Sequence, residues 1–390
     1  MGLHSCRSGH AGRCDAPRGR IDCRKAAARL CKGRGRVANR LGALCLVWLC
    51  LVYPAWADTL RIATWNAELS RDGPGLLLRD ILRGDDPQAE AVAQIIARVA
   101  PDILLLQNVD YDMELRALTA LRDLIAAQGL RYGTVFARLP NTGMATGHDM
   151  DGDGRLGEPE DAQGYGAFSG QGGMAILSRY PVDTDRVQDM SGILWRDLPQ
   201  AMLPVVDGAP FPSEQAQNVL RLADVAQWAV PVLHDSGRIT LLAFHANAPV
   251  FDGPEDRNGR RNHDQLRFWQ YYLDGAFGPA PDGRFVLLGH ANQDPHKSEG
   301  IKAGIRGLLG DLRLSDPVPL RDSVPPGTPP EATVEWPRVA PPQMRVSYVL
   351  PSRDWRISAS GVHWPMAGEA ARISQAASRH RMVWVDLQID

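Results

Sequence analysis

The stretch Gly289-His290-Ala291-Asn292-Gln293-Asp294-Pro295 directly continues the apolar run Arg284–Gly289. Short apolar runs that end in Gly, Asn, Asp or Pro are typical of buried strands followed by a turn. Polar side chains placed where a strand ends are well positioned for binding or catalysis, because loops at strand ends carry function on a rigid scaffold. This junction therefore predicts a strand whose end presents His290 and Asn292 to a site.

Outward from this junction, seven more segments have the alternating or continuously apolar pattern of strands. They are Leu60–Asn66, Asp102–Gln107, Met174–Arg179, Trp228–Leu233, Ile239–His245, Arg345–Pro351 and Met382–Ile389. Helical spacing of apolar residues appears in Pro87–Ala100, Leu115–Gln128, His263–Leu273 and Gly300–Leu309. We expect Asn262 to cap the third of these helices. Early interleaving of strands and helices, followed by strands joined through short turns, predicts a two-sheet α/β sandwich that forms a single domain.

Two long segments interrupt this pattern. Residues 141–173 are rich in Gly and Asp and predict a loop insertion, the kind of long loop that usually serves a function. Residues 316–342 are dense in proline, with Pro-Pro at three places, and predict an extended excursion over the surface.

The first 57 residues differ from the rest. A basic stretch, the short apolar run Leu41–Tyr53 and the ending Ala55-Trp56-Ala57 have the three parts of a secretory signal peptide. The apolar run is shorter than the roughly 20 residues that a membrane span needs. We expect cleavage after Ala57, export to the periplasm or beyond, a mature domain over residues 58–390, and no membrane attachment after cleavage.

Cysteine and charge follow the same division. All six cysteines precede position 58, so the expected mature chain has neither a thiol nucleophile nor Cys-ligated zinc. From position 58 onward the chain has 32 Lys and Arg against 43 Asp and Glu, a net charge of −11. Broad, non-specific nucleic-acid binding is disfavoured, because it needs a basic face.

Five segments in order carry a family resemblance. They are Thr64-Trp-Asn-Ala-Glu68, Leu106-Gln-Asn-Val109, Gly172–Arg179, the turn 289–295 and Ser378-Arg-His380, with Arg345–Leu350 before the last. Together they resemble the endonuclease/exonuclease/phosphatase superfamily, which includes DNase I-like nucleases and sphingomyelinase-like phosphodiesterases. The resemblance spans Leu60 to Leu387 and implies a metal-dependent hydrolase of phosphate esters.

The resemblance also implies roles for particular residues. His245 and His380 would contact the scissile phosphate, and Asn66 and Asn292 would position it, as charge builds up on the phosphoryl oxygens. A carboxylate-held divalent cation, commonly magnesium, would polarise the phosphate. His290 would occupy the place of the residue that activates water.

The carboxylates of the family pattern are replaced in this sequence. Asn108 stands where the metal-binding Glu is expected, and His290 where the water-activating Asp is expected. Ser347 replaces the Asp that orients the last histidine, and Arg379 replaces the Asp before that histidine. A pocket without these four acids is neutral to positive, which suits an anion and weakens the case for magnesium.

Several residues offer a substitute metal site. Asp110 lies two positions after Asn108, and so on the same face of a continuing strand. Glu68 likewise lies two positions after Asn66, and Asp294 follows the turn at Asn292. Alternatively, these acids are solvated or support other residues. His245, His290 and His380 together would favour a borderline metal such as zinc.

The segment before the helix at 263–273 contains Arg257, Arg260 and Arg261. Arg260 and Arg261 are candidates for binding phosphate in the cleft. Equally, the arginines could pair with the acids beside them.

The insertion contains a separate motif. Asp149, Asp151, Asp153, Arg155 and Glu160 occupy positions 1, 3, 5, 7 and 12 of an EF-hand-type loop, with Gly154 at position 6. No EF-hand helices flank it, so we interpret it as an isolated loop with a structural calcium; the alternative is an acidic, solvated turn.

Two functional hypotheses remain open from the sequence. The first is an exported phosphoester hydrolase, a phosphodiesterase by resemblance, with impaired activity. The second is a non-catalytic protein that keeps the fold and binds a phosphate ester or another anion.

Overall fold

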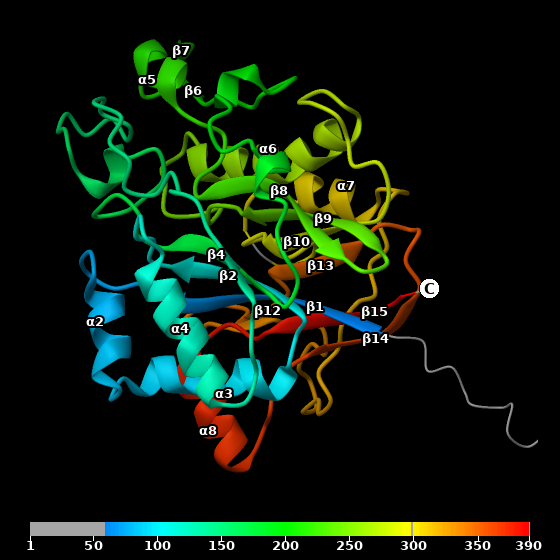
Figure 1. Cartoon of the computed structure of the whole chain (residues 1–390). Helices are drawn as coiled ribbons and strands as arrows, with labels where there is room; N and C mark the ends of the chain where they lie inside the picture. Colours follow the sequence, from blue (N-terminus) through cyan, green and yellow to red (C-terminus); the bar gives the residue numbers. More distant parts are fainter. Residues whose placement is uncertain (1–58, 298, 390) are drawn as a thin grey trace, which may run out of the picture. The chain divides into compact units, whose positions relative to one another are not determined.

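The computed structural model of the chain describes residues 59–297 and 299–389, which form two main sheets (Figure 1). The expected signal peptide and its cleavage site lie outside the described residues. The first sheet has the order β14-β15-β1-β2-β4-β3 and the second the order β13-β10-β9-β8-β5. The bounds of the first six are Ile357–Val362, Val383–Gln388, Thr59–Leu69, Ile103–Val109, Gly173–Ser178 and Thr134–Phe136. Those of the other five are Ser347–Pro351, Phe285–His290, Gly237–His245, Ala226–His234 and Gln188–Asp189. The predicted two-sheet sandwich is confirmed.

The sheets pack face to face through a shared apolar core. The first sheet contributes residues such as Leu60 and Ile62, and the second contributes Trp228, Leu241 and Val286. All five are fully buried. Burying one large apolar side chain stabilises a fold by roughly 2 kcal/mol, so this layer holds the two sheets together without any disulfide.

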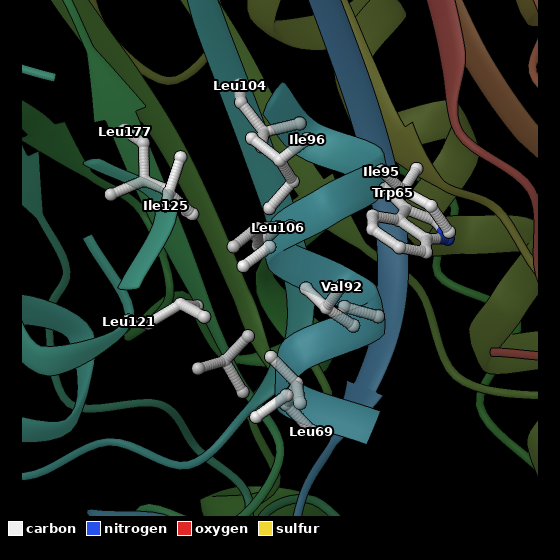
Figure 2. Packing of buried hydrophobic residues seen from close by; sticks show 14 of the residues in the cluster. Trp65, Leu69, Val92, Ile95, Ile96, Leu104, Leu106, Leu121, Ile125 and Leu177 are labelled. Carbon is white, nitrogen blue, oxygen red and sulfur yellow. The ribbon is translucent and has the colours of Figure 1, made fainter. Parts of the chain in front are cut away.

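Helices cover the outer face of each sheet. On the first sheet lie α2 (Leu76–Arg83), α3 (Pro87–Val99), α4 (Arg116–Ala127) and α8 (Gly368–Ala377). Figure 2 shows Val92 and Ile96 of α3 against Leu104 and Leu106 of β2, in the cluster that also contains Trp65 of β1. On the second sheet lie α5 (Glu214–Val219), α6 (Arg257–Leu273) and α7 (Ala303–Leu309). The amphipathic helices found by spacing are therefore confirmed, whereas α2, α5 and α8 were not predicted.

Local sequence explains where α3 starts, but not where α6 starts. The Asp86 side chain accepts a hydrogen bond from the Ala89 N–H, and Pro87 follows at the first helical position. The prediction that Asn262 caps α6 is wrong, because the helix begins at Arg257. Asn262 is instead fully buried inside it, and its side-chain amide donates to the carbonyls of Asn247 and Ala291.

Strand register brings polar residues into line. β9 and β10 are parallel, with His245 beside His290, and β10 pairs antiparallel with β13, which places Ser347 on the other side of His290. In the other sheet, β1 and β2 are parallel and Asn66 lies beside Gln107. Strands that run in the same direction end at the same edge of a sheet, so each sheet presents one row of polar residues.

The proline-dense segment 316–342 is a surface excursion only in part. Residues 322–324 and 337–340 are exposed, but Ala332, Thr333 and Val334 are buried. The strand β11 (Val334–Glu335) pairs with β12 (Gln343–Met344), and Val334 also bridges to His380. The expected surface course is therefore wrong at the centre of the segment, which packs against the strand ends.

The insertion 141–173 has bridges within itself and a polar contact to the rest of the domain. Thr142 and Gly164 form a parallel bridge, Ala145 and Ala162 an antiparallel one, and the buried Asn141 side chain donates to Ser191 O.

Within residues 59–297 and 299–389, no helix has the length and apolar character required to cross a bilayer.

Candidate functional site

Three histidines meet at the strand ends. His245 ends β9, His290 ends β10, and His380 lies just before β15. The His290 ring lies between the other two, with its centroid 5.1 Å from that of His245 and 4.7 Å from that of His380. The His290 and His380 side chains are buried, and His245 is partly exposed. The structure therefore brings together the three histidines that the sequence placed in one site.

The neighbours of His290 fix which of its ring nitrogens carries the proton, and burial keeps the ring uncharged. Its Nε2 lies 2.9 Å from the Asn292 Oδ1, and the Asn292 amide nitrogen donates to Ala246 O. Since an amide oxygen can only accept, His290 Nε2 carries the proton, and its bare Nδ1 accepts a hydrogen bond from the Ser347 hydroxyl at 3.0 Å. Burial lowers the His290 pKa to about 4. At neutral pH, His290 is an uncharged ring whose two nitrogens are both engaged.

His245 and His380 have no such partners. The Nδ1 of each is buried and has no hydrogen-bond partner among the described residues. Burial lowers the pKa of both rings well below the ordinary value, and neighbouring His290 lowers it further. Because a general acid must be protonated before it can donate, neither ring is suited to that role at neutral pH. As neutral rings they can still donate one N–H or offer one lone pair to a ligand.

Asn66 of β1 is tied to the segment just before β15, the neighbouring strand of the first sheet. Its carbonyl oxygen accepts a hydrogen bond from the Ser378 hydroxyl at 2.9 Å, and its side-chain Oδ1 accepts one from the Glu68 N–H at 3.3 Å. Ser378 is two residues before His380, so Asn66 and His380 are held near each other through short links. The carbonyl of His380 in turn accepts a hydrogen bond from the Trp65 indole.

Glu68 is the carboxylate nearest in sequence to Asn66, and its oxygens are already engaged. One oxygen accepts a hydrogen bond from the Arg379 N–H at 2.7 Å and, at 3.0 Å from the Ser378 hydroxyl oxygen, shares that hydroxyl's single proton with the Asn66 carbonyl. The Arg379 guanidinium donates Nε–H to the other oxygen at 2.8 Å and pairs with it through Nη2. The replacement of an acid by Arg379 thus adds a cation and also occupies a carboxylate that could have replaced the missing ligand.

Asp110 is engaged as well. It accepts hydrogen bonds from the Ser70 hydroxyl at 2.7 Å, the Arg71 N–H at 2.8 Å and the Gly172 N–H at 2.9 Å. Burial raises its pKa, although these three donors act in the opposite direction. The prediction that Asp110 substitutes as a metal ligand does not fit this geometry, in which its carboxylate fastens three loops together.

The remaining candidate metal ligands, Asn108 and Asp294, are poorly placed to bind a hard cation. Asn108 has a left-handed backbone (φ 58°). Its side-chain oxygen packs closely against Gly172: a Cβ built on that glycine would lie only 2.9 Å from the oxygen. Asp294 is buried and accepts from the main-chain N–H groups of His296, Lys297 and Arg345. It shapes the turn after Asn292.

A magnesium ion does not fit these residues. Mg²⁺ requires hard, anionic oxygen ligands in near-octahedral geometry. Of the acids considered for the cleft, Glu68 is bound to Arg379, Asp110 to three donors and Asp294 to three main-chain N–H groups. The predicted ligand Asn108 contributes only a neutral amide. A zinc ion on the three histidines is also disfavoured, because both nitrogens of His290 are engaged.

Residues 333–336, which include the strand β11, pack beside Ser347 and His380, and the sequence interpretation missed them. The Thr333 hydroxyl accepts from the main-chain N–H groups of Val346 and Ser347, and Thr333 O accepts from Arg381 N–H. The Trp336 ring meets the His380 ring edge to face, with centroids 5.5 Å apart. The run Thr333-Val-Glu-Trp336 has β-branched and aromatic residues typical of a strand, and this signal was available within the proline-dense segment.

The two candidate phosphate-binding arginines, Arg260 and Arg261, make contacts within the protein. Arg261 is buried and donates to the carbonyls of Gln163, Arg221, Leu222 and Ala223, and it pairs with Asp224 at 3.1 Å. Its prediction as a phosphate ligand is wrong, because every guanidinium nitrogen already has a partner. Arg260, in the first turn of α6, donates from Nε to Glu255 O at 3.1 Å, in the loop before the helix. Both arginines organise α6 and its preceding loop.

The acidic loop forms a compact cluster. One oxygen from each of Asp149, Asp151 and Asp153 lies within 4.8 Å of the others, the only such group of three metal-binding side chains in the described part of the chain. Glu160, expected at position 12, lies in a short 3-10 helix and does not belong to this group. Asp149 accepts from the N–H groups of Gly152 and Gly154. The loop thus provides the first three predicted ligands without the bidentate glutamate.

Comparison with known proteins agrees with this fold. Residues 63–380 match the model of the endonuclease/exonuclease/phosphatase family. A protein described by that same family name from Beutenbergia cavernae has a similar structure at 19% identity, covering 85% of this chain and 72% of the other, with a TM-score of 0.52.

Sphingomyelinase C from Streptomyces griseocarneus is similar at 18% identity over 84% of this chain and 99% of the other, with a TM-score of 0.46. No curated protein matches by sequence. The family match covers most of the chain, and the order of motifs and the two-sheet sandwich agree with it. The chain belongs to the endonuclease/exonuclease/phosphatase family.

Proposed function

We propose that the expected cleft around His245, His290 and His380, called the histidine cleft, binds a phosphate ester or a related oxyanion without the metal-dependent hydrolysis of its family. The observation that carries this proposal is His290. It occupies the place of the water-activating acid, with its proton directed to Asn292 and its lone pair directed to Ser347. It therefore has no free lone pair with which to take a proton from water.

The absence of available carboxylates supports the same conclusion. An attacking water requires activation, and the phosphoryl oxygens require a cation as charge builds up. Here the Arg379 guanidinium is bound to Glu68 and mostly exposed, with 63% of its side chain accessible. The ligand would instead meet neutral N–H donors from His245 and His380 and the amide of Asn66. Neutral donors bind an anion more weakly than a metal does, so we expect low affinity.

The proposal is tested on the chain from Asp58 onward, with a generic phosphodiester and with DNA. Magnesium, manganese, zinc and calcium are each supplied separately. The comparison is a variant that restores the family acids: Asn108→Glu, His290→Asp, Ser347→Asp and Arg379→Asp. We expect no metal-dependent turnover by the wild-type protein. Metal-dependent turnover by the wild type that His380→Ala abolishes would contradict the proposal.

Binding is measured independently of turnover. Phenyl phosphate is titrated into the wild-type protein in the presence of EDTA and followed by ³¹P NMR. We expect weak, saturable binding that His380→Ala abolishes. His234→Ala is the matched control, because His234 lies at the other end of the β8–β9 hairpin from His245. Absence of binding, or equal loss in both variants, would refute the anion-binding part of the proposal.

We also propose that the protein is exported and that the acidic loop binds a structural calcium ion. The first rests on the leader pattern in residues 1–57 and the second on the spacing and proximity of Asp149, Asp151 and Asp153. N-terminal sequencing of the secreted protein should begin at Asp58. Calcium should raise the melting temperature of the wild type and not that of Asp151→Ala; an equal response of both proteins would refute the calcium site.

A further inference from the structure

A cavity lies on the outer helical layer of the first sheet. It has a volume of about 200 Å³, and its lining comes from α3, from the segment after β14 and from α8. The lining residues are Gln94, Ile95, Arg98, His363, Ala370 and Ile373. None of them belongs to the histidine cleft, and none has been assigned a role above.

One side of this cavity is cationic and has little to balance it. Arg98 is exposed in the last turn of α3 and forms no ion pair with the described residues. His363 is mostly buried beside it, and burial together with the positive charges of Arg98 and Arg381 lowers the His363 pKa to about 4. Asp322 is the one nearby acid that opposes this effect. These surroundings therefore disfavour the charged form of His363.

Positive charge also lies behind His363. Arg381 is buried against Trp364, the next residue, with its guanidinium carbon 4.8 Å from the ring centroid. Its Nη1 donates to main-chain carbonyls that include His380 O, while its Nε has no partner among the described residues. Arg321 lies 4.5 Å from the same ring. Neither guanidinium forms an ion pair with a carboxylate in residues 59–297 and 299–389; Glu335 offsets part of their charge, and Arg381 still lowers the His363 pKa.

The other side of the cavity is apolar. Ile95 is buried in the α3 face, and Ala370 and Ile373 are one turn apart on α8. Ile373 packs against the helical core of the first sheet. A ligand that fills this space would therefore place a charged group on one side and a hydrocarbon group on the other.

We propose that this cavity binds a small organic anion, with a carboxylate or phosphate group on Arg98 and His363 and a short apolar body against Ile95 and Ile373. This site is separate from the proposed function of the cleft and would survive its refutation. An anion stabilises the imidazolium of His363, so binding should be coupled to the uptake of a proton. Affinity should rise as the pH falls from 7 to 5.

The probes are butyrate, butyl phosphate, inorganic phosphate and butanol, titrated into the chain from Asp58 onward at pH 5.5 and 7. The His363 Cε1–H resonance, assigned by its absence in His363→Gln, reports binding and protonation. We expect saturable shifts with butyrate or butyl phosphate, with the stronger of the two identifying the head group. Butanol should give no charge-dependent shift, and inorganic phosphate should bind at least several-fold more weakly than butyl phosphate.

Variants then separate a built site from a general charge effect. Arg98→Ala should weaken binding of the better probe by roughly tenfold or more, the usual loss for a charge-assisted hydrogen bond. His363→Gln should remove most of the pH dependence. Arg372→Ala, an exposed arginine on α8 outside the cavity, is the matched control and should change affinity less than twofold. No saturable shift in the wild type, or equal weakening by Arg98→Ala and Arg372→Ala, would overturn the proposal.

Discussion

The two sheets contribute opposite halves to the histidine cleft. On the first sheet, the loops after β1 and β2 contain acids, but Glu68 is bound to Arg379 and Asp110 to three N–H and O–H donors. On the second sheet, the strand ends contain no acid in the expected places, and His290 is held between neutral Ser347 and Asn292. The first sheet has acids whose oxygens are engaged by donors, together with the uncharged His380, and the second has the uncharged rings of His245 and His290.

This difference shows that the number of acids near a cleft does not determine whether it can hold a metal. A carboxylate is a ligand only when an oxygen is free to face the ion, and local donors compete for that oxygen. On the second sheet the substitutions agree with one another: Ser347 satisfies His290, and Asn292 fixes the tautomer. Neither half therefore suits a metal ion. On the first sheet donors engage the acids, and on the second sheet neutral residues replace them.

The largest expected effect concerns acid sensitivity of the histidine half. The unfolded chain protonates His290 near its ordinary pKa of about 6.5, whereas the folded chain does so only near 4. The free energy of unfolding should therefore fall as the pH decreases through this range, and be unaffected by His290 above it. His290 alone accounts for about 3 kcal/mol, and His245 and His380 act in the same direction.

Urea unfolding at several pH values checks this prediction, with His290→Gln as the comparison so that other titrating groups cancel. The variant should lose less stability between pH 6.5 and 4 than the wild type. Parallel pH profiles would mean that His290 takes up its proton over the same pH range in the folded and unfolded chains, so that folding does not lower its pKa.

The acidic half should depend on Asp110 for stability. Asp110→Ala leaves the Ser70 hydroxyl and the N–H groups of Arg71 and Gly172 without their acceptor, and should lower the free energy of unfolding by about 2 kcal/mol. Asp72→Ala, an exposed acid in the same region, should change it by less than about 0.5 kcal/mol. If both variants unfold alike in denaturant, Asp110 is not the fastener inferred here.

A smaller loss is expected from Ser347→Ala. The variant leaves the buried Nδ1 of His290 without its donor, which should lower the free energy of unfolding by about 1 kcal/mol. The Cε1–H chemical shift of His290 should also change, because the tautomer is no longer fixed from both sides. An unchanged shift at neutral pH would show that Ser347 does not set the tautomer.

The smallest expected effect is that of Arg379→Ala. The Arg379 partner of its ion pair with Glu68 is largely solvent-exposed, so the loss should be about 0.5 kcal/mol and should diminish at high salt. Arg372→Ala is again the control. A loss that does not depend on salt would indicate that the Arg379 stem stabilises through packing rather than through charge.

The sequence was sufficient for the fold and for the residues of the cleft. The order of strand-end motifs predicted that Asn66, His245, His290 and His380 share one site; His245 and His290 end strands, Asn66 lies within β1, and His380 lies just before β15. The start of α6 was missed because Asn262 is a good capping residue locally, while its actual partners are carbonyls of Asn247 and of Ala291, which is 29 residues away.

The state of each cleft residue could not be predicted in the same way. Glu68 is engaged by Arg379, 311 residues away, and Asp110 by Gly172, 62 residues away. Such contacts depend on how loops from different strands meet, which no local pattern encodes. The position of Trp336 against His380 is of the same kind.

The most direct test of the central claim is a titration of the wild-type chain with Mn²⁺, with calcium present to saturate the acidic loop. Mn²⁺ within the cleft would broaden the Cε1–H resonances of His245 and His380. We predict no selective broadening in the wild type at millimolar Mn²⁺, and clear broadening in the variant that restores the four acids. Selective broadening in the wild type that magnesium reverses would contradict the account.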